Sequence, residues 1–289
     1  MNESQSVLSA TQRNNFRSTL DILERRGKEA SERAALKAHL QNELAISSTE
    51  KESNQAQFRA LPRLASAMPL QWTRTGLFAN FGKGQRRILE HTVLEGRSDY
   101  RVKMSGEELD MYDCDVFLHA IQLAQRTSVN DPIYFERIAF LRAIGRGKDL
   151  STESYKRLHA SMSRLANTII FVEGHGDGEP FKLFDKLEWG QEKRYWIMMD
   201  PIVVSMFANV CLAYIDMQVR LRLKSPFAKY LQSYVSGHSI GVHRISWESL
   251  RKWSGSRGRE RDFKRRALPL ALRELEEKKN KKNWEIGDK

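Results

Sequence analysis

The sequence predicts an α+β fold in which a polar N-terminal tail precedes two similar domains of helices and short strands. Three observations lead to this prediction. Phe16 and Phe58 are the only aromatic side chains of residues 1–60, the order of helices and strands recurs after about 110 residues, and the excess positive charge lies in the last third of the chain. We expect a mostly helical or disordered tail over 1–60, a first domain over 61–200 and a strongly basic second domain over 201–289.

The composition favours a soluble, cytoplasmic protein. Of the 289 residues, 40% are hydrophobic, which is enough for a sizeable core. No run approaches the roughly 18 to 20 uncharged apolar residues of a membrane span, and the N-terminus lacks the basic and apolar regions of a signal peptide. Cys114 and Cys211 are too few for a disulfide framework, which is typical of a reducing compartment.

The distribution of charge indicates a polyanionic partner. Lys and Arg number 48 against 36 Asp and Glu, giving a net charge of +12. Residues 1–60 and 61–200 each carry an excess of one positive charge, whereas 201–289 carry 19 basic and 9 acidic groups. A segregated charge of this kind is expected of a surface that contacts phosphate.

The tail contains one helical pattern. Leu36, Leu40 and Leu44 recur at every fourth position of a stretch rich in Ala, Glu and Lys, which predicts a helix near 30–46. This helix could dock on the body of the same chain, or it could bind a partner or a second copy.

The first domain is predicted to hold a helix-turn-helix. Strand-like runs over 88–95 and 99–106 bracket Gly96 and suggest a hairpin, and Asp113 can cap the helix that follows. A short strand over 132–135 then leads to a helix over 136–144, ended by Gly145 in the left-handed conformation. A basic helix begins at Ser151 and Thr152 and ends near residue 166.

Three antiparallel strands are expected after this helix, over 168–172, 181–189 and 193–200. The order of helix, short strand, helix, turn, basic helix and β-ribbon is typical of a winged helix. The sequence therefore predicts a winged-helix first domain.

The second domain repeats the pattern. A helix end over 230–237, a short strand over 241–246 and a helix closing on Gly255 precede a strongly basic helix. Gly255 follows Gly145 by 110 positions, and the triplet Phe263-Lys264-Arg265 follows Tyr155-Lys156-Arg157 by 108. This period indicates domain duplication. Pro269 falls inside the second basic helix, which it should kink or divide.

The basic residues around the two turns are the candidate DNA contacts. In the second domain we expect base and phosphate contacts from Lys252, Arg257, Arg259, Arg261, Lys264 and Arg265. In the less basic first domain we expect phosphate contacts from Lys148, Ser151, Thr152, Ser154, Lys156 and Arg157. The alternative is that these charge runs are ordinary solvated helix faces.

Catalytic and metal-binding motifs are not indicated. The segment GLFANFGKG differs from a phosphate-binding loop, because five residues separate Gly76 from Gly82 and Gly84 stands where Ser or Thr should hold magnesium. His238 and His243 flank a turn without the spacing of a metal site. The His-x-His motif of tyrosine nicking enzymes does not occur. We expect no enzyme activity, no cofactor and no metal.

A further signal comes from four segments, TRTGLFANFGKG, SGEELDMYDCDVFLHAIQLAQ, PIYFERIAFLRAIG and STESYKRLHASMSRLANTIIF. Together they resemble the TrfA-type plasmid replication initiators, a family of tandem winged-helix Rep proteins. The likeness covers residues 70–260 and is strongest over 74–172. It implies binding to repeated origin sequences, called iterons, opening of the neighbouring duplex, and recruitment of the host replicative helicase and sliding clamp.

The resemblance is uneven at the residue level. Lys264, Arg265 and the stretch 257–261 match the family's basic second recognition helix by position in the fold, not by letter. The clamp-binding segment of relatives has only poor counterparts, Gln41 to Leu44 and Gln55 to Phe58.

The function predicted from sequence is plasmid replication initiation by iteron binding, without catalysis. A winged-helix transcriptional regulator is the alternative, and an adaptor that binds only proteins is a third. Because the first domain has almost no net charge, we also expect it to form a homodimer through an exposed strand edge, testable at Ile170 if that side chain is exposed.

Overall fold

Residues 65–279 are described by the computed structural model, apart from 83, 85, 98–100, 129–130, 174–178, 190–193, 210 and 239–242. The predicted tail over 1–60, its helix near 30–46 and the two clamp-like segments lie outside the described residues. The described residues belong to one compact unit.

Helix α2 (Met111–Ala124) is the central helix of this unit, and most of its side chains are buried. It begins two residues before the predicted cap. Asp110 is the N-cap, accepting hydrogen bonds from the Tyr112 and Asp113 N–H groups, and the Asp113 carboxylate accepts one from the Asp110 N–H. This reciprocal capping box places Asp113 at N3 instead of the N-cap.

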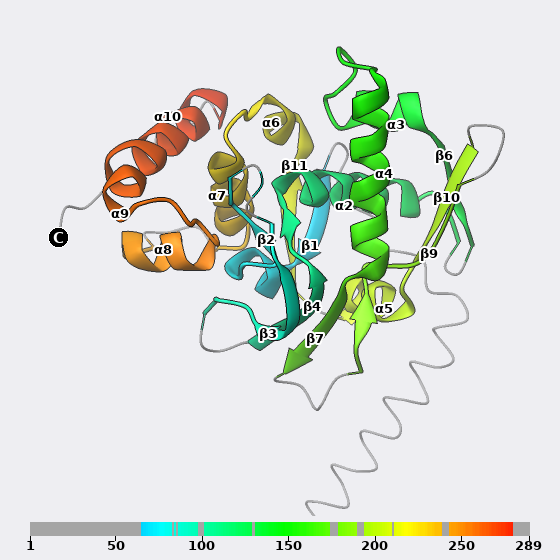
Figure 1. Cartoon of the computed structure of the whole chain (residues 1–289), viewed down its shortest axis with the longest axis horizontal. Helices are drawn as coiled ribbons and strands as arrows, with labels where there is room; N and C mark the ends of the chain where they lie inside the picture. Colours follow the sequence, from blue (N-terminus) through cyan, green and yellow to red (C-terminus); the bar gives the residue numbers. More distant parts are fainter. Residues whose placement is uncertain are drawn as a thin grey trace, which may run out of the picture. The chain divides into compact units, whose positions relative to one another are not determined.

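The first predicted helix-turn-helix is present. Strand β6 (Ile133–Glu136) leads into α3 (Arg137–Ala143), and α4 (Thr152–Asn167) follows the turn. Leu158, Met162 and Leu165 form the buried stripe of α4. Strands β9 (Phe184–Trp189) and β10 (Arg194–Met199) lie beside α4, and β10 pairs with both β6 and β9 in an antiparallel sheet of order β6-β10-β9 (Figure 1).

The prediction of one three-stranded ribbon after α4 was wrong. Strand β7 (Ile169–Glu173) instead pairs with β4 (Arg101–Glu107) and β8 (Phe181–Lys182), within a sheet of order β3-β4-β7-β8. The segment 181–189 is split at Leu183 between β8 and β9, which belong to different sheets. The predicted hairpin is confirmed, since β3 (Ile88–Val93) pairs antiparallel with β4.

Ile170 is fully buried in β7, between two neighbouring strands. The expectation that it lies at an exposed strand edge was therefore wrong. The physical reason is the long-range pairing with β4, which turns the edge strand of a ribbon into an inner strand of a larger sheet.

Strands from both sides of residue 200 share a sheet. Strand β1 (Ala65–Pro69) pairs antiparallel with β11 (Leu212–Asp216), and β2 (Phe78–Ala79) pairs parallel with β5 (Leu109–Asp110). The 3₁₀ turn η1 (Leu70–Arg74), α5 (Pro201–Asn209) and α6 (Met217–Arg222) complete this region. The two predicted domains thus have a common core, and the boundary at residue 200 stays a prediction.

A buried charge cluster joins α2 to two helices that follow residue 200 in the chain. The carboxylate of Asp115 on α2 accepts a hydrogen bond of 2.6 Å from Arg220 Nε on α6 and pairs with Lys229 on α7 (Pro226–Ser236). All three residues are buried, and burial lowers the pKa of Lys229. The two buried cations therefore share one counter-ion, and Arg220 also donates to the Lys229 carbonyl and to the Ser233 hydroxyl.

The C-terminal elements are α8 (Trp247–Trp253), α9 (Glu260–Asp262), the π turn η2 (Phe263–Ala267) and α10 (Leu268–Lys279) (Figure 1). The predicted strand over 241–246 is wrong for 243–246, which have no regular structure. Pro269 was expected to kink or divide the basic helix, and the regular helix is interrupted just before it, by the π turn between α9 and α10. Cys114 is buried, whereas Cys211 is exposed.

Candidate nucleic-acid interface

The two predicted turns have the same backbone geometry. Gly145 has a φ of 76° and Gly255 a φ of 68°, the left-handed conformation expected of a glycine after a helix. In each turn the glycine N–H donates to the carbonyl three residues back, at 3.1 Å, and the next N–H donates five residues back. These bonds are the Schellman motif, formed at positions 110 residues apart.

The helices on either side of the turns also correspond. Helices α3 and α8 each have seven residues and begin 110 positions apart, at Arg137 and Trp247. The helices after the turns begin at Thr152 and Glu260, 108 positions apart. The structure therefore has two helix-turn-helix segments of similar dimensions. Residues 137–167 carry seven basic and two acidic side chains, and residues 247–279 carry eleven and six.

Three candidate hydroxyls lie at the N-terminus of α4. Ser151 is the N-cap and accepts a hydrogen bond of 3.3 Å from the Ser154 N–H, while its own N–H donates to Asp149. Ser151 and Thr152 are exposed and Ser154 is half-buried. A helix N-terminus with exposed hydroxyls can accommodate an anion such as a phosphate.

The cations of the first segment differ in their contacts. Lys148 and Lys156 are exposed. The guanidinium of Arg157, although exposed, lies 4.1 Å from the centroid of the Tyr112 ring on α2. Burial raises the pKa of Tyr112 to about 12, so this phenol stays neutral beneath the cation. Arg157 thus ties α4 to α2 and keeps its charge at the surface.

The basic residues of the second segment are mostly exposed. Arg259 is the N-cap of α9, and Arg261 and Arg265 are exposed on the turns that follow. Lys264 is exposed with its Nζ 5.4 Å from the centroid of the Trp247 ring on α8. Lys252 is exposed and forms a 3.1 Å ion pair with Glu95.

Arg257 differs from the other candidates, because its guanidinium contacts a buried carboxylate. It pairs with the buried carboxylate of Glu108 and lies 4.9 Å from the centroid of the Phe81 ring. Glu108 also accepts hydrogen bonds from Arg87, at 2.8 to 3.1 Å. Burial would raise the pKa of Glu108, but the bonds from Arg87 and Arg257 outweigh it and lower that pKa. The guanidinium expected to contact DNA is therefore part of an ion cluster around the buried Glu108 carboxylate.

Arg251 and Arg266 also belong to this basic segment, but they are not among the DNA contacts predicted from the sequence. Arg251 donates to the Gly258 carbonyl at 2.9 Å and pairs with Glu260 at 3.4 Å, which fixes the loop before α9. Arg266 is exposed beside Arg265. The only sequence signal for either is membership of the basic run, which does not distinguish a positioning contact from a DNA contact.

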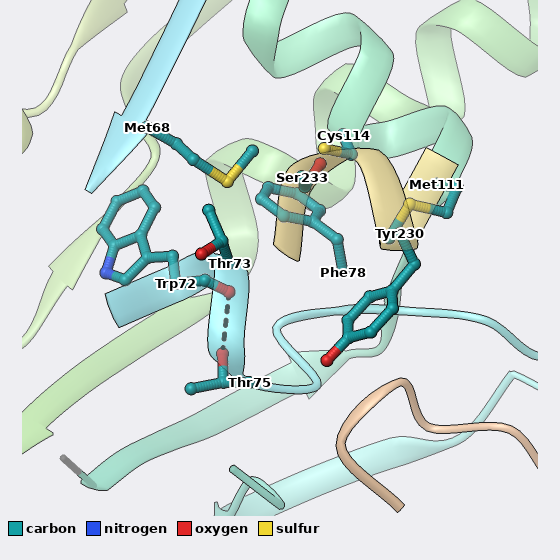
Figure 2. A pocket seen from close by; sticks show the side chains of 9 residues that line it. All are labelled: Met68, Trp72, Thr73, Thr75, Phe78, Met111, Cys114, Tyr230 and Ser233. Atoms are coloured by element: carbon teal, nitrogen blue, oxygen red, sulfur yellow. Dashed lines mark hydrogen bonds between the residues drawn. The ribbon is translucent and has the colours of Figure 1, made fainter. Parts of the chain in front are cut away.

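A small cavity lies in the shared core, and its lining includes none of the candidate DNA contacts (Figure 2). It has a volume of about 10 Å³ and is lined by Met68, Trp72, Thr73, Thr75, Phe78, Met111, Cys114, Tyr230 and Ser233. Among the described atoms, the buried Tyr230 hydroxyl has no hydrogen-bond partner, and burial raises its pKa. The cavity is below the usual volume of small-molecule sites, which begins near 300 Å³.

Membrane spans and metal clusters were also sought in the described part of the chain. No helix there has the length and apolar composition needed to cross a bilayer. The described residues include no group of three or more His, Cys, Asp or Glu side chains that could hold a metal ion. His238 and His243 instead contact each other edge to face, with ring centroids 4.6 Å apart.

Comparison with solved structures gives distant likenesses, two of which are to RctB. No protein-family model and no curated protein sequence matches the chain. A crystal structure of domains 2 and 3 of RctB is 14% identical, with a TM-score of 0.48 over 72% of this chain and 85% of that one. A second RctB structure of domains 2–3 is 12% identical, with a TM-score of 0.40 over 69% and 80%. Likenesses this distant assign neither a family nor a function.

Proposed function

We propose that this protein is a cytoplasmic plasmid replication initiator that binds repeated origin sequences in double-stranded DNA and has no catalytic activity. The observation that carries the proposal is the pair of helix-turn-helix segments with matching Schellman turns, the second of which presents exposed Arg and Lys side chains. Helix-turn-helix segments bind DNA by laying the helix after the turn in the major groove.

The first segment is proposed to be a winged helix. Its elements follow the order α2, β6, α3, α4, β9, β10, with β7 and β8 of another sheet between α4 and β9, and the β9-β10 hairpin is joined to β6 through β10. This order is that of a helix-turn-helix with an antiparallel wing. In the second segment α7, α8 and α9–α10 have the corresponding order of helices.

The two segments are proposed to divide the work of binding. Arg259, Arg261, Lys264 and Arg265 lie at the beginning of the second basic helix, where side chains reach base edges. The hydroxyls and lysines at the beginning of α4 suit phosphate contacts, which position a protein without reading sequence.

Two different DNA-binding segments in one chain favour initiation over transcriptional regulation. A chain of this kind can contact a single asymmetric repeat, whereas a symmetric dimer is suited to a palindrome. By the family resemblance, opening of the origin, recruitment of the host helicase and sliding clamp, and a free homodimer belong to the same proposal. The alternative remains a winged-helix regulator.

Selection of bound fragments from random DNA tests this proposal. We expect the full chain to select one asymmetric site and to bind arrays of direct repeats of it. The double variant Arg261→Ala/Arg265→Ala should lose this selection, and Glu153→Gln, an exposed change on α4, is the matched control. A lone palindrome would favour the regulator. Absence of salt-dependent binding would favour the protein-binding adaptor.

A further inference from the structure

The second basic helix contains one turn that is wider than an α-helical turn. Over Phe263–Ala267 the backbone forms a π turn, in which the Leu268 N–H donates to the carbonyl of Phe263, five residues back. In an α-helix this bond would reach four residues back. Single π turns are rare and often lie at functional sites. Here the π turn carries Lys264, Arg265 and Arg266, three of the basic residues beside the helix N-terminus.

Pro269 is one reason for the wider turn. In a continuous α-helix the nitrogen of residue 269 would bond to the carbonyl of Arg265, but proline has no N–H and its ring would collide with that carbonyl. An extra residue in the turn relieves this conflict, which explains why the helix continues through the proline.

The spacing of the buried residues is the second reason. Leu268, Ala271 and Leu275 are buried at the three- and four-residue intervals of an α-helix. Phe263, which is only 4% exposed, lies five residues before Leu268 and packs edge to face on Phe227 of α7, with ring centroids 4.9 Å apart.

An uninterrupted α-helix would put a different residue in the core. Four residues before Leu268 is Lys264, so without the π turn Lys264 would lie on the buried stripe and Phe263 would rotate away from Phe227. In the structure Lys264 is exposed and contacts the Trp247 ring. The extra residue in the π turn thus places Phe263, instead of Lys264, on the buried face of the helix.

We propose that this π turn sets the register of the DNA-reading residues, with Phe263 and Pro269 as positioning residues. The inference rests on the proposed function and adds its specificity determinant. Moving the anchor by one residue would rotate everything before it by about 100° around the helix axis. The π turn therefore determines whether Arg259 and Arg261 lie on the side of the helix that faces the bases.

Two variants distinguish the effect of the helix register from the effect of the π turn itself. The register-shifted variant, Phe263→Lys/Lys264→Phe/Pro269→Ala, keeps the net charge and restores a regular apolar stripe at 264, 268, 271 and 275. The register-keeping variant combines deletion of Ala267 with Pro269→Ala. It also removes the π turn, but it leaves Phe263 four residues before Leu268 and Arg259 and Arg261 unrotated.

Both variants are compared with the wild-type chain by circular dichroism, thermal unfolding and selection from random DNA. We expect both to fold. The register-shifted variant should prefer different bases at the positions read by Arg259 and Arg261 and bind the wild-type site about 10- to 100-fold more weakly. Its binding to non-specific DNA at low salt should change less than about twofold, since the charge is the same. The register-keeping variant should retain the wild-type preference at those positions.

Each other outcome overturns the inference. An unchanged preference in the register-shifted variant would show that register is irrelevant, and an equal change in both variants would show that any disturbance of the helix suffices. Failure of the register-shifted variant alone to fold would also overturn the inference, because Phe263 and Pro269 would then serve stability and not the choice between two registers. A wild-type chain that selects no sequence would overturn the proposed function together with this inference. The outcomes above would overturn this inference alone.

Discussion

At the scale of single residues, similar cations have different surroundings. Arg261 and Arg265 are exposed at the beginning of the basic helix, Lys156 is exposed on α4, and Arg257 is held by Glu108. The side chain alone therefore does not define a DNA contact. What matters is whether the charge is already compensated within the protein.

The exposed cations lead to a prediction about specificity. Arg261→Ala or Arg265→Ala should cost about 1–3 kcal/mol on the specific site and change the base preference, because each removes a contact to a base edge. Lys156→Ala should weaken all sequences about equally. Competition binding with specific and scrambled duplexes measures both effects. The reverse pattern would exchange the proposed roles of the two segments.

Glu108 leads to a prediction about pH. Its lowered pKa means that the unfolded chain binds a proton near pH 4.5, the ordinary value, while the folded chain does not. Its stabilising effect is therefore present above that pH and lost as the pH falls through the folded-state pKa. Urea unfolding of wild type and Glu108→Gln over this range should show the steeper loss in wild type. Parallel curves would contradict the assignment.

At the scale of elements, the two turns have the same backbone but different neighbours. A Cβ on Gly255 would lie 2.6 Å from the Cβ of Ala79, whereas one on Gly145 would come no closer than 3.4 Å to Leu221. Both would be strained by the positive φ.

These turns predict unequal costs of substitution. Gly145→Ala should reduce the free energy of unfolding by about 1 kcal/mol, and Gly255→Ala by more, because the methyl group also collides with Ala79. Gly258→Ala, which has no neighbour within 4 Å of its Cβ, is the matched control. Urea titration measures all three. Equal losses for Gly145 and Gly255 would mean that the chain relaxes around Ala79.

The proposed homodimer would form through an exposed strand edge. Strand β3 is an edge strand of its sheet, and Ile88 on it is 77% exposed. If the proposed homodimer forms through this edge, Ile88→Lys should shift the free protein toward monomer without changing base preference. Sedimentation over a hundredfold concentration range tests this prediction. Ile170→Lys should unfold the chain instead, because Ile170 is buried. A wild-type chain that is monomeric throughout would remove the homodimer from the proposal.

At the scale of the whole molecule, the two helix-turn-helix segments share one core, and most of the excess positive charge lies in residues 201–289. The strand pair β1-β11, the cluster of Asp115, Arg220 and Lys229, and the Arg257–Glu108 pair all join residues far apart in sequence. Substitution in one half is therefore expected to affect the other through these contacts.

The charge distribution predicts the salt dependence of binding. If about six to eight phosphates are neutralised, log affinity should fall against log salt with a slope of magnitude about 5 to 7. Lys156→Ala, which removes an exposed charge on α4, should reduce this slope by about 1, whereas Arg257→Ala should leave it nearly unchanged because Arg257 is already paired with Glu108. Titrations across several salt concentrations measure the slopes. A slope near zero would contradict DNA binding.

The sequence by itself determined the features that depend on neighbouring residues. The helices around Gly145 and Gly255, the hairpin of β3 and β4 and the basic run after the second turn follow from caps, periodicity and turn residues within a few positions. The tertiary structure decided the rest, because it depends on contacts between distant segments. The pairing of β7 with β4 buried Ile170, a carboxylate 149 positions away engaged Arg257, and packing against Phe227 brought Phe263 inward in a π turn. Local patterns specify which elements form, but only the shared core decides which of their faces remain available to DNA.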